Sequence, residues 1–247
     1  MDEKNVKLKL AYDGTGYHGW QRQKNGLTVQ ELLEEKISTM INGPVTVHGS
    51  GRTDAGVHAL GQVCNFKHRT RLEPGHFKNG LNSMLPGDIF VLEASSAPES
   101  FHSRYSAKAK TYEYRILNTP EPDIFLRRYV WHVPCRLDPE AVRDCLAVLE
   151  GRRDFSSFQS AGSFTRDPVR NLYRAEVTTD FEGLLRVVLE ADGFLRHMVR
   201  NIVGTVINAV RGGMGPGDIV KILEARDRTA AGVKAPAGGL FLVEVSY

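Results

Sequence analysis

Two ionisable side chains lie two residues apart in a glycine-rich stretch, GSGRTDAGVHA, which spans residues 49–59. They are Arg52 and Asp54. A carboxylate in such a loop can act as a nucleophile or a general base, and a guanidinium can bind a phosphate or stack on a nucleobase. Asp54 can also serve only the turn, because an aspartate side chain bonds its own backbone and Gly56 tolerates a positive φ. The sequence leaves both interpretations of Asp54 open.

A second candidate lies in the apolar segment 194–210, whose hydrophobic residues recur at helical spacing and predict a long helix with a broad buried face. Arg196 and Arg200 lie one turn apart at the edge of that face. Most helix-edge arginines point into water. The alternative is that Arg200 reaches into a cleft toward a carboxylate, and the sequence alone does not decide between the two.

A third candidate is Tyr112, which shares one face of a predicted strand with Tyr114. Tyrosines in such a position usually belong to the core and have a bonded hydroxyl. The surrounding segment, SRYSAKAKTYEYR, nevertheless interleaves aromatic rings with cations, a mixture that suits phosphates and stacked bases. The cations are Arg104, Lys108, Lys110 and Arg115.

Other chemical motifs are absent or misleading. Residues 14–19 fit the dinucleotide pattern GxGxxG, but the segment WQRQKNG at residues 20–26 separates them from the next helix, whereas that motif must open directly into one. A phosphate-loop pattern, GxxxxGK[ST], does not occur. The histidines His18, His58 and His197 lack metal-ligand spacing, so no metal site is predicted.

The composition is that of a globular protein, with 41% hydrophobic and 25% charged residues in 247 and a net charge of +3. The 21 arginines outnumber 11 lysines, which is a weak indication of an RNA or phosphate partner. On charge alone, a solvated and slightly basic surface is the better interpretation. No segment resembles a signal peptide or a membrane span, so we expect a cytoplasmic protein that binds no membrane. The three cysteines show no CxxC spacing and are interpreted as reduced core thiols.

Hydrophobic periodicity predicts the order β-α-β-β-α-β twice. In the first half a capping box at Thr28 opens the first helix, and the predicted elements are residues 6–12, 28–41, 45–48, 62–67, 74–85 and 89–93. In the second half Asp138 and Pro139 open the first helix, Gly151 ends it, and one extra helix is added. Its elements are residues 111–117, 138–149, 172–178, 184–190, 194–210, 219–225 and 240–245.

This order predicts an α+β fold of two ferredoxin-like halves, residues 1–104 and 105–247, packed side by side with a catalytic cleft between them. The loop with Asp54 then joins the second and third strands of the first half, at one end of a sheet. A fold alone does not give a function.

Six segments in order resemble the tRNA pseudouridine synthase A (TruA) family over nearly the whole chain. They are AYDGTGYHGWQRQ, GSGRTDAGVHALGQVCNF, LNSMLPGDI, FHSRYSAKAKTYEYRI, GFLRHMVRNIVGT and GGLFLVEVSY. The resemblance implies an isomerase that converts uridine to pseudouridine at positions 38, 39 and 40 of the tRNA anticodon stem-loop. It also implies a homodimer that needs no cofactor and no metal.

The resemblance implies a role for each candidate residue. Asp54 corresponds to the catalytic nucleophile, Tyr112 to a tyrosine that lines the uracil pocket, and Arg200 to an arginine that pairs with the catalytic carboxylate. Arg52 corresponds to an arginine that helps to displace the target base. The chain departs from the family pattern at Ser50 and Arg153, where alanine and histidine are common, and neither departure affects these assignments.

Two rival functions remain. The first is a non-catalytic RNA-binding module, since ferredoxin-like sheets also build RRM domains, but no segment fits the RRM aromatic motif. The second is a hydrolase that uses Asp54 with His58. The product separates the alternatives, because isomerisation leaves the mass of the RNA unchanged and hydrolysis of the glycosidic bond leaves an abasic site.

Overall fold

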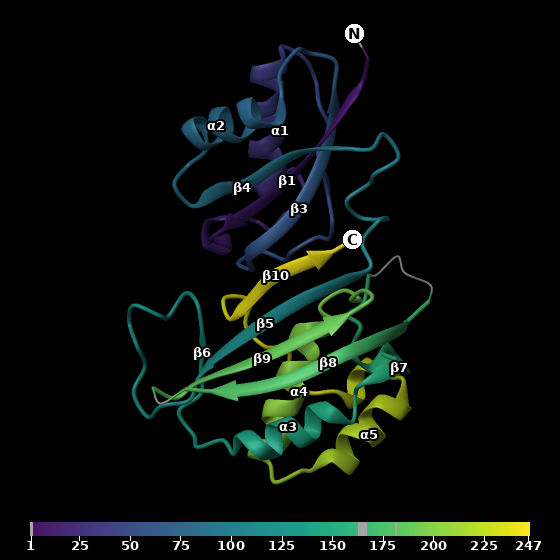
Figure 1. Cartoon of the computed structure of the whole chain (residues 1–247). Coiled ribbons are helices and arrows are strands. Elements are labelled where there is room, and N and C mark those ends of the chain that lie inside the picture. The colour runs from purple at the N-terminus through teal and green to yellow at the C-terminus, as the bar shows by residue number, and fades with distance from the viewer. Residues whose placement is uncertain (1, 163–166, 181) are drawn as a thin grey trace. The chain divides into compact units, whose positions relative to one another are not determined.

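A computed structural model of the chain describes residues 2–162, 167–180 and 182–247 (Figure 1). Met1, the first residue of the predicted first half, lies outside them. The fold is a mixed α+β fold with two compact units. The first unit contains Met1–Lys108 and Phe241–Tyr247, and the second contains Ala109–Leu240.

The first unit has the predicted order β-α-β-β-α-β. Its elements are β1 (Lys4–Tyr12), α1 (Val29–Ile41), β2 (His48–Gly49), β3 (His58–His68), α2 (Pro74–Met84) and β4 (Ile89–Ala97). Strand β1 lies between β4 and β3 and is antiparallel to both, and β2 pairs with β3. Helices α1 and α2 pack against each other on one side of this sheet (Figure 1). Its core includes the fully buried Leu8, Leu10, Leu33, Phe66 and Phe77.

The second unit contains the predicted strands and helices together with two short strands that periodicity did not indicate. Its elements are β5 (Ala109–Leu117), β6 (Trp131–His132), α3 (Pro139–Ala147), β7 (Gly151–Asp154), β8 (Val169–Thr179), β9 (Leu184–Ala191), α4 (Met198–Arg211) and α5 (Pro216–Ala225). Strand β9 lies between β5 and β8, β7 pairs with β8, and these contacts are antiparallel. Strand β6 is parallel to β5. The three helices pack against one another (Figure 1).

The last strand, β10 (Leu240–Ser246), differs from its predicted place. The predicted second half, 105–247, includes it, but residues from Phe241 onward belong to the first unit. There Phe241 and Leu242 pair in parallel with His58 and Ala59 of β3. A division along the chain cannot detect this pairing, because the paired residues are about 180 positions apart.

Strand β2 is shorter than the predicted strand 45–48 and contains only His48 and Gly49. The backbone of Val47 bonds to side chains of α1 instead of a neighbouring strand. Its N–H donates to Glu34 Oε1 at 3.1 Å, and its carbonyl accepts from Gln30 Nε2 at 2.9 Å. The backbone groups that a strand would use are therefore already occupied.

Helix α4 begins four residues later than the predicted helix 194–210. His197 has a left-handed backbone conformation with φ of 62°, which stops the helix from extending toward Phe194. Arg196 therefore precedes the helix and does not lie one turn before Arg200 on it. Its Nη1 donates to the carbonyl of Ala161 at 2.8 Å.

Cys64 and Cys145 are buried as expected, whereas Cys135 is partly exposed, and all three thiols are free. Burial raises the pKa of the Cys64 thiol. No helix in the described part of the chain is long and apolar enough to span a membrane.

Candidate active site

Asp54 lies in the loop of residues 50–57 that joins β2 to β3, hereafter the Asp54 loop. A tight turn forms its tip, because the N–H of Val57 donates to the carbonyl of Asp54 at 3.1 Å. Gly56, the third residue of the turn, has φ of 77°, which favours glycine as in a type II turn. A backbone hydrogen bond therefore closes the turn, and the side chain of Asp54 is half-buried.

A buried glutamine of β3 forms hydrogen bonds to the start of the Asp54 loop. Gln62 is fully buried; its Nε2 donates to the carbonyl of Gly51 at 2.9 Å, and its Oε1 accepts from Ser50 Oγ at 2.7 Å. The same Nε2 lies 3.4 Å from the hydroxyl of Tyr12, which is 2.8 Å from Thr53 Oγ1. The loop is thus fastened by side chains of two core strands immediately before Asp54.

The hydroxyl of Tyr12, which bonds to Thr53 and Gln62, stays neutral at physiological pH. Burial raises the pKa of Tyr12 to about 12, although the bonds to Thr53 and Gln62 act in the opposite direction. The phenol therefore stays protonated through the physiological range, and the bond to Thr53 does not depend on pH there.

Replacement of Gln62 by methionine is expected to lower the free energy of unfolding by about 1–3 kcal/mol, because the buried hydroxyl of Ser50 and the partly buried carbonyl of Gly51 each lose the bond to Gln62. Urea denaturation measures this loss. As a matched control, Gln23→Met at an exposed position is expected to change stability by less than about 0.5 kcal/mol. Equal stability of the two variants would show that Gln62 does not fasten the loop.

Two glycines of the pattern GxGxxG at residues 14–19, Gly14 and Gly19, pack against the Asp54 loop. A side chain at Gly14 would meet the carbonyl oxygen of Val57 at 2.0 Å, and one at Gly19 would meet that of Thr53 at 2.5 Å. Gly19 also has φ of 85°, and the N–H of Trp20 donates to the carbonyl of Thr53 at 3.0 Å. These glycines are therefore required for close backbone packing against the loop, in agreement with the rejection of a dinucleotide motif.

His58 follows the loop and has a structural environment. Its ring is 1% exposed and stacks on Phe241 with 4.7 Å between ring centroids. Its Nδ1 accepts from the N–H of Gly14 at 3.0 Å and lies 3.1 Å from Asp13 Oδ1. Nδ1 cannot accept from Gly14 and donate to Asp13 at once; the backbone bond fixes it as the acceptor. This environment does not favour His58 as the base of a hydrolase.

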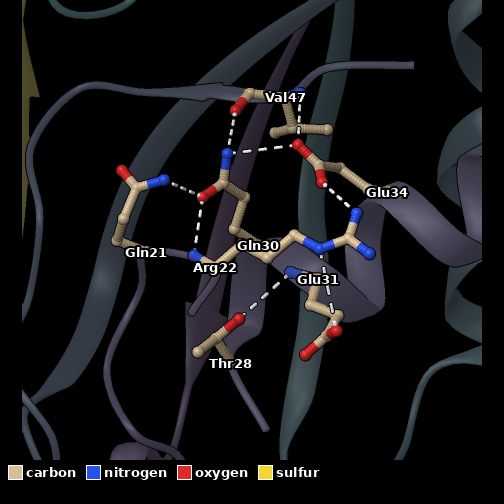
Figure 2. A network of polar contacts seen from close by, with 7 residues as sticks. All are labelled: Gln21, Arg22, Thr28, Gln30, Glu31, Glu34 and Val47. Atoms are coloured by element: carbon tan, nitrogen blue, oxygen red, sulfur yellow. Dashed lines mark hydrogen bonds and ion pairs between the residues drawn. The ribbon is translucent and has the colours of Figure 1, made fainter. Parts of the chain in front are cut away.

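Arg52 is exposed and is oriented by a neighbouring glutamine. Its Nε donates to Gln21 Oε1 at 3.1 Å, and Gln21 Nε2 donates to Gln30 Oε1 at 2.6 Å. Gln30 lies in the first turn of α1 and belongs to the polar network drawn in Figure 2. Arg52 is thus connected through Gln21 to a buried side chain of a helix.

Glu34 is the anionic centre of this network (Figure 2). The residue is 7% exposed, and its carboxylate accepts from Gln30, from the N–H of Val47 and from Arg22 Nη1, the last at 3.3 Å. Thr28 accepts from the N–H of Glu31 as the predicted N-cap, but the Glu31 carboxylate faces Arg22 instead of completing a capping box. The network thereby ties the segment before α1 and the entry to β2 to one helix.

Tyr112 lies on β5 in the second unit and is buried, as are Tyr114 and Ile116 on the same face. Its ring packs edge-on against Phe194 with centroids 5.1 Å apart. Tyr112 and Tyr114 therefore lie on one face of the strand, as predicted. Buried surroundings and an aromatic neighbour fit both a core tyrosine and one wall of an apolar pocket.

Arg200 lies in the first turn of α4 and is fixed by the segment around Ala235. Its Nε donates to the carbonyl of Ala235 at 2.8 Å, and its own carbonyl accepts from the N–H of Ala235 at 3.0 Å. The hydroxyl of Tyr114 donates to the next carbonyl, that of Pro236, at 2.8 Å. Arg200 is therefore held at a defined position and does not simply extend into water.

Gly204 makes this arrangement possible. A side chain at this position would meet the carbonyl oxygen of Val233 at 2.0 Å and the nitrogen of Ala235 at 2.7 Å, so only glycine allows the segment to lie against α4. A glycine in the interior of a helix costs about 1 kcal/mol relative to alanine. That cost was a detectable signal in the sequence, whereas the roles of Gln62 and Tyr114 had no signal of their own.

The four predicted site residues divide between the two units. Asp54 and Arg52 belong to the first, Tyr112 and Arg200 to the second. Each has contacts within its own unit, and that of Arg52 is an exposed side-chain bond to Gln21. Within the described residues, no group of three histidine, cysteine or acidic side chains is arranged to hold a metal ion.

The chain is similar to known proteins over nearly its whole length. The family model for tRNA pseudouridine synthase matches residues 10–106 and 146–247. Proteins named tRNA pseudouridine synthase A from Thermoanaerobacter pseudethanolicus and Caldicellulosiruptor bescii are 42% and 43% identical, over 99% of this chain and 100% of their own length. The protein of the same name from Bdellovibrio bacteriovorus is 42% identical over 98% of this chain and 94% of its own.

Among solved structures, a chain of the crystal structure titled as a Cbf5-Nop10-Gar1 complex aligns with a TM-score of 0.37 and 14% identity. The alignment covers 96% of this chain and 48% of the other. This likeness is too weak to support an argument.

Proposed function

The chain belongs to the tRNA pseudouridine synthase A (TruA) family, and on that premise we propose that it isomerises uridine to pseudouridine at positions 38, 39 and 40 of the tRNA anticodon stem-loop. The observation that carries the proposal is the Asp54 loop. It presents a carboxylate on a backbone that core side chains hold in place. A catalytic group that is already fixed in position needs less ordering when the substrate binds, which lowers the barrier to reaction.

The reaction rearranges one nucleoside and needs no second substrate. The bond between ribose C1′ and uracil N1 breaks, the base rotates, and a bond forms between C1′ and C5. The proton on C5 leaves to solvent, and N1 gains one, so the mass of the RNA does not change. A carboxylate supports this chemistry either as a covalent partner or as the base that removes the C5 proton.

In the proposed assignment Asp54 is the nucleophile, and Arg200 supplies the positive charge that keeps a carboxylate ionised and oriented. Tyr112 provides an aromatic wall for uracil. Arg52 is exposed and held at its Nε, so its two terminal nitrogens are available to the RNA. Such an arginine suits displacement of the target base, which costs a few kcal/mol of unstacking.

We further propose that both units are ferredoxin-like and that the enzyme acts as a homodimer in the cytoplasm. The strand order β4-β1-β3-β2 in the first unit supports the first part. The family resemblance supports the second. The division at residues 104 and 105 and the cleft between the halves stay predictions.

The test is release of tritium from a tRNA transcript labelled at C5 of uridine. We expect release from a transcript with uridine at positions 38–40, and none when those positions carry cytidine. Mass spectrometry of the product separates the alternatives. An unchanged mass with tritium release supports isomerisation, abasic sites would indicate a hydrolase, and binding without either product would indicate an RNA-binding module.

A further inference from the structure

Three aromatic side chains of the first unit, His48, His102 and Tyr105, lie in a row, hereafter the aromatic ladder, with neighbouring rings tilted by 39° to each other. The rings of His48 and His102 have centroids 4.8 Å apart, and those of His102 and Tyr105 are 4.5 Å apart. The outermost ring, that of Tyr105, is 77% exposed. Burial does not explain this ring, because an exposed tyrosine contributes little to a core.

The ladder stands on a rigid base. Ser103 Oγ donates to the carbonyl of His48, and the N–H of Ser103 donates to Asn65 Oδ1 at 2.9 Å. The hydroxyl of Tyr247 donates to the carbonyl of Ser103 at 2.8 Å. The turn that carries Tyr105 is thus fastened to β2, β3 and the C-terminal residue, so its conformation is set before any partner binds.

The middle ring is neutral. His102 Nδ1 accepts from the N–H of Arg104 at 3.1 Å and therefore carries no proton. Burial and the neighbouring His48 lower the pKa of His102, which maintains this state at physiological pH. A neutral ring provides an uncharged stacking surface behind Tyr105.

Cations lie at the exposed ring and at the base of the ladder. The guanidinium of Arg104 lies over the ring of Tyr105, 5.8 Å from its centroid, at the outer limit of a cation–π contact. Lys7 Nζ lies 4.3 Å from the ring of Tyr247 at the base of the ladder. An exposed ring beside positive charge matches the way in which proteins bind unpaired nucleotides, with the base on the ring and a phosphate on the cation.

We propose that Tyr105 stacks an unpaired nucleobase of the tRNA substrate and that Arg104 binds a phosphate of the same strand. This inference rests on the proposed function for the identity of the RNA. Strand β2, which carries His48, leads directly into the Asp54 loop, so the ladder and the proposed nucleophile share one rigid segment. The ladder is a binding site and takes no part in the chemistry.

The experiment measures the dissociation constant of unmodified tRNA over a series of salt concentrations. Tyr105→Ala is expected to weaken binding by about 5- to 100-fold without changing the slope of log Kd against log salt, because stacking releases no counterions. Arg104→Gln is expected to reduce that slope by about one. Tyr105→Phe retains the ring and is expected to bind like the wild type.

Tyr173→Ala is the matched control, because Tyr173 is also exposed, at 50%, and lies on β8 of the second unit. We expect it to bind tRNA like the wild type. Wild-type affinity of Tyr105→Ala, or equal losses for the alanine and phenylalanine variants, would overturn the stacking site. Pseudouridine formation by the wild type at saturating tRNA, measured in parallel, tests the proposed function separately.

Discussion

Asp54→Asn is expected to reduce pseudouridine formation by at least about 10³-fold, the scale on which removal of a nucleophile acts in other enzymes. Asparagine has the same shape but cannot attack as an anion or remove a proton. The bonds that hold the loop involve the backbone of Asp54 and the side chains of Ser50, Thr53 and Gln62, and this substitution does not alter them. We therefore expect the fold and the affinity for tRNA to be retained.

Tritium release under single-turnover conditions measures the loss, and thermal unfolding checks the fold. The control makes the same chemical change at Asp138, the N-cap of α3, where its side chain accepts from the N–H of Glu140. Asparagine caps a helix as well as aspartate does, so Asp138→Asn should retain full activity. Normal turnover by Asp54→Asn would refute the assignment of the nucleophile.

The sequence predicted local structure well where residues adjacent in the chain determine it. Alternating apolar residues predicted β1, and the Thr28 and Asp138 caps predicted the starts of α1 and α3. The position of Asp54 in a loop between two strands followed from the same reasoning. Periodicity and capping depend only on near neighbours, so one sequence is sufficient to detect them.

The differences arise from one backbone conformation and from long-range contacts. The late start of α4 results from the backbone of His197, although Phe194 and Leu195 continue the apolar pattern. The strand before the Asp54 loop is short because Glu34 and Gln30 bond to Val47. The partners that place Arg52 and Arg200, which are Gln21 and Ala235, are 31 and 35 residues away in the chain. No local pattern contains such information.

Replacement of Gly204, which contacts the segment around Ala235, is expected to lower the rate of pseudouridine formation. Gly204→Ala should favour the helix by propensity, but the added methyl group would displace Val233 and Ala235, which it would meet at 2.0 and 2.7 Å. The bond from Arg200 Nε to Ala235 would then be lost. A hydrogen bond to a charged group is worth about 1.5–3 kcal/mol, so we expect the rate of pseudouridine formation to fall by about 10- to 100-fold.

A double-mutant cycle shows whether this loss acts through Arg200. Arg200→Ala alone should lower the rate strongly, and Gly204→Ala in that background should then cost little more, because the group that it positions is already absent. Gly217→Ala on α5 is the control, since nothing lies within 4 Å of a side chain at that position and the substitution should leave the rate unchanged. Independent, additive losses at positions 200 and 204 would mean that Gly204 supports only the packing of α4 and does not position Arg200.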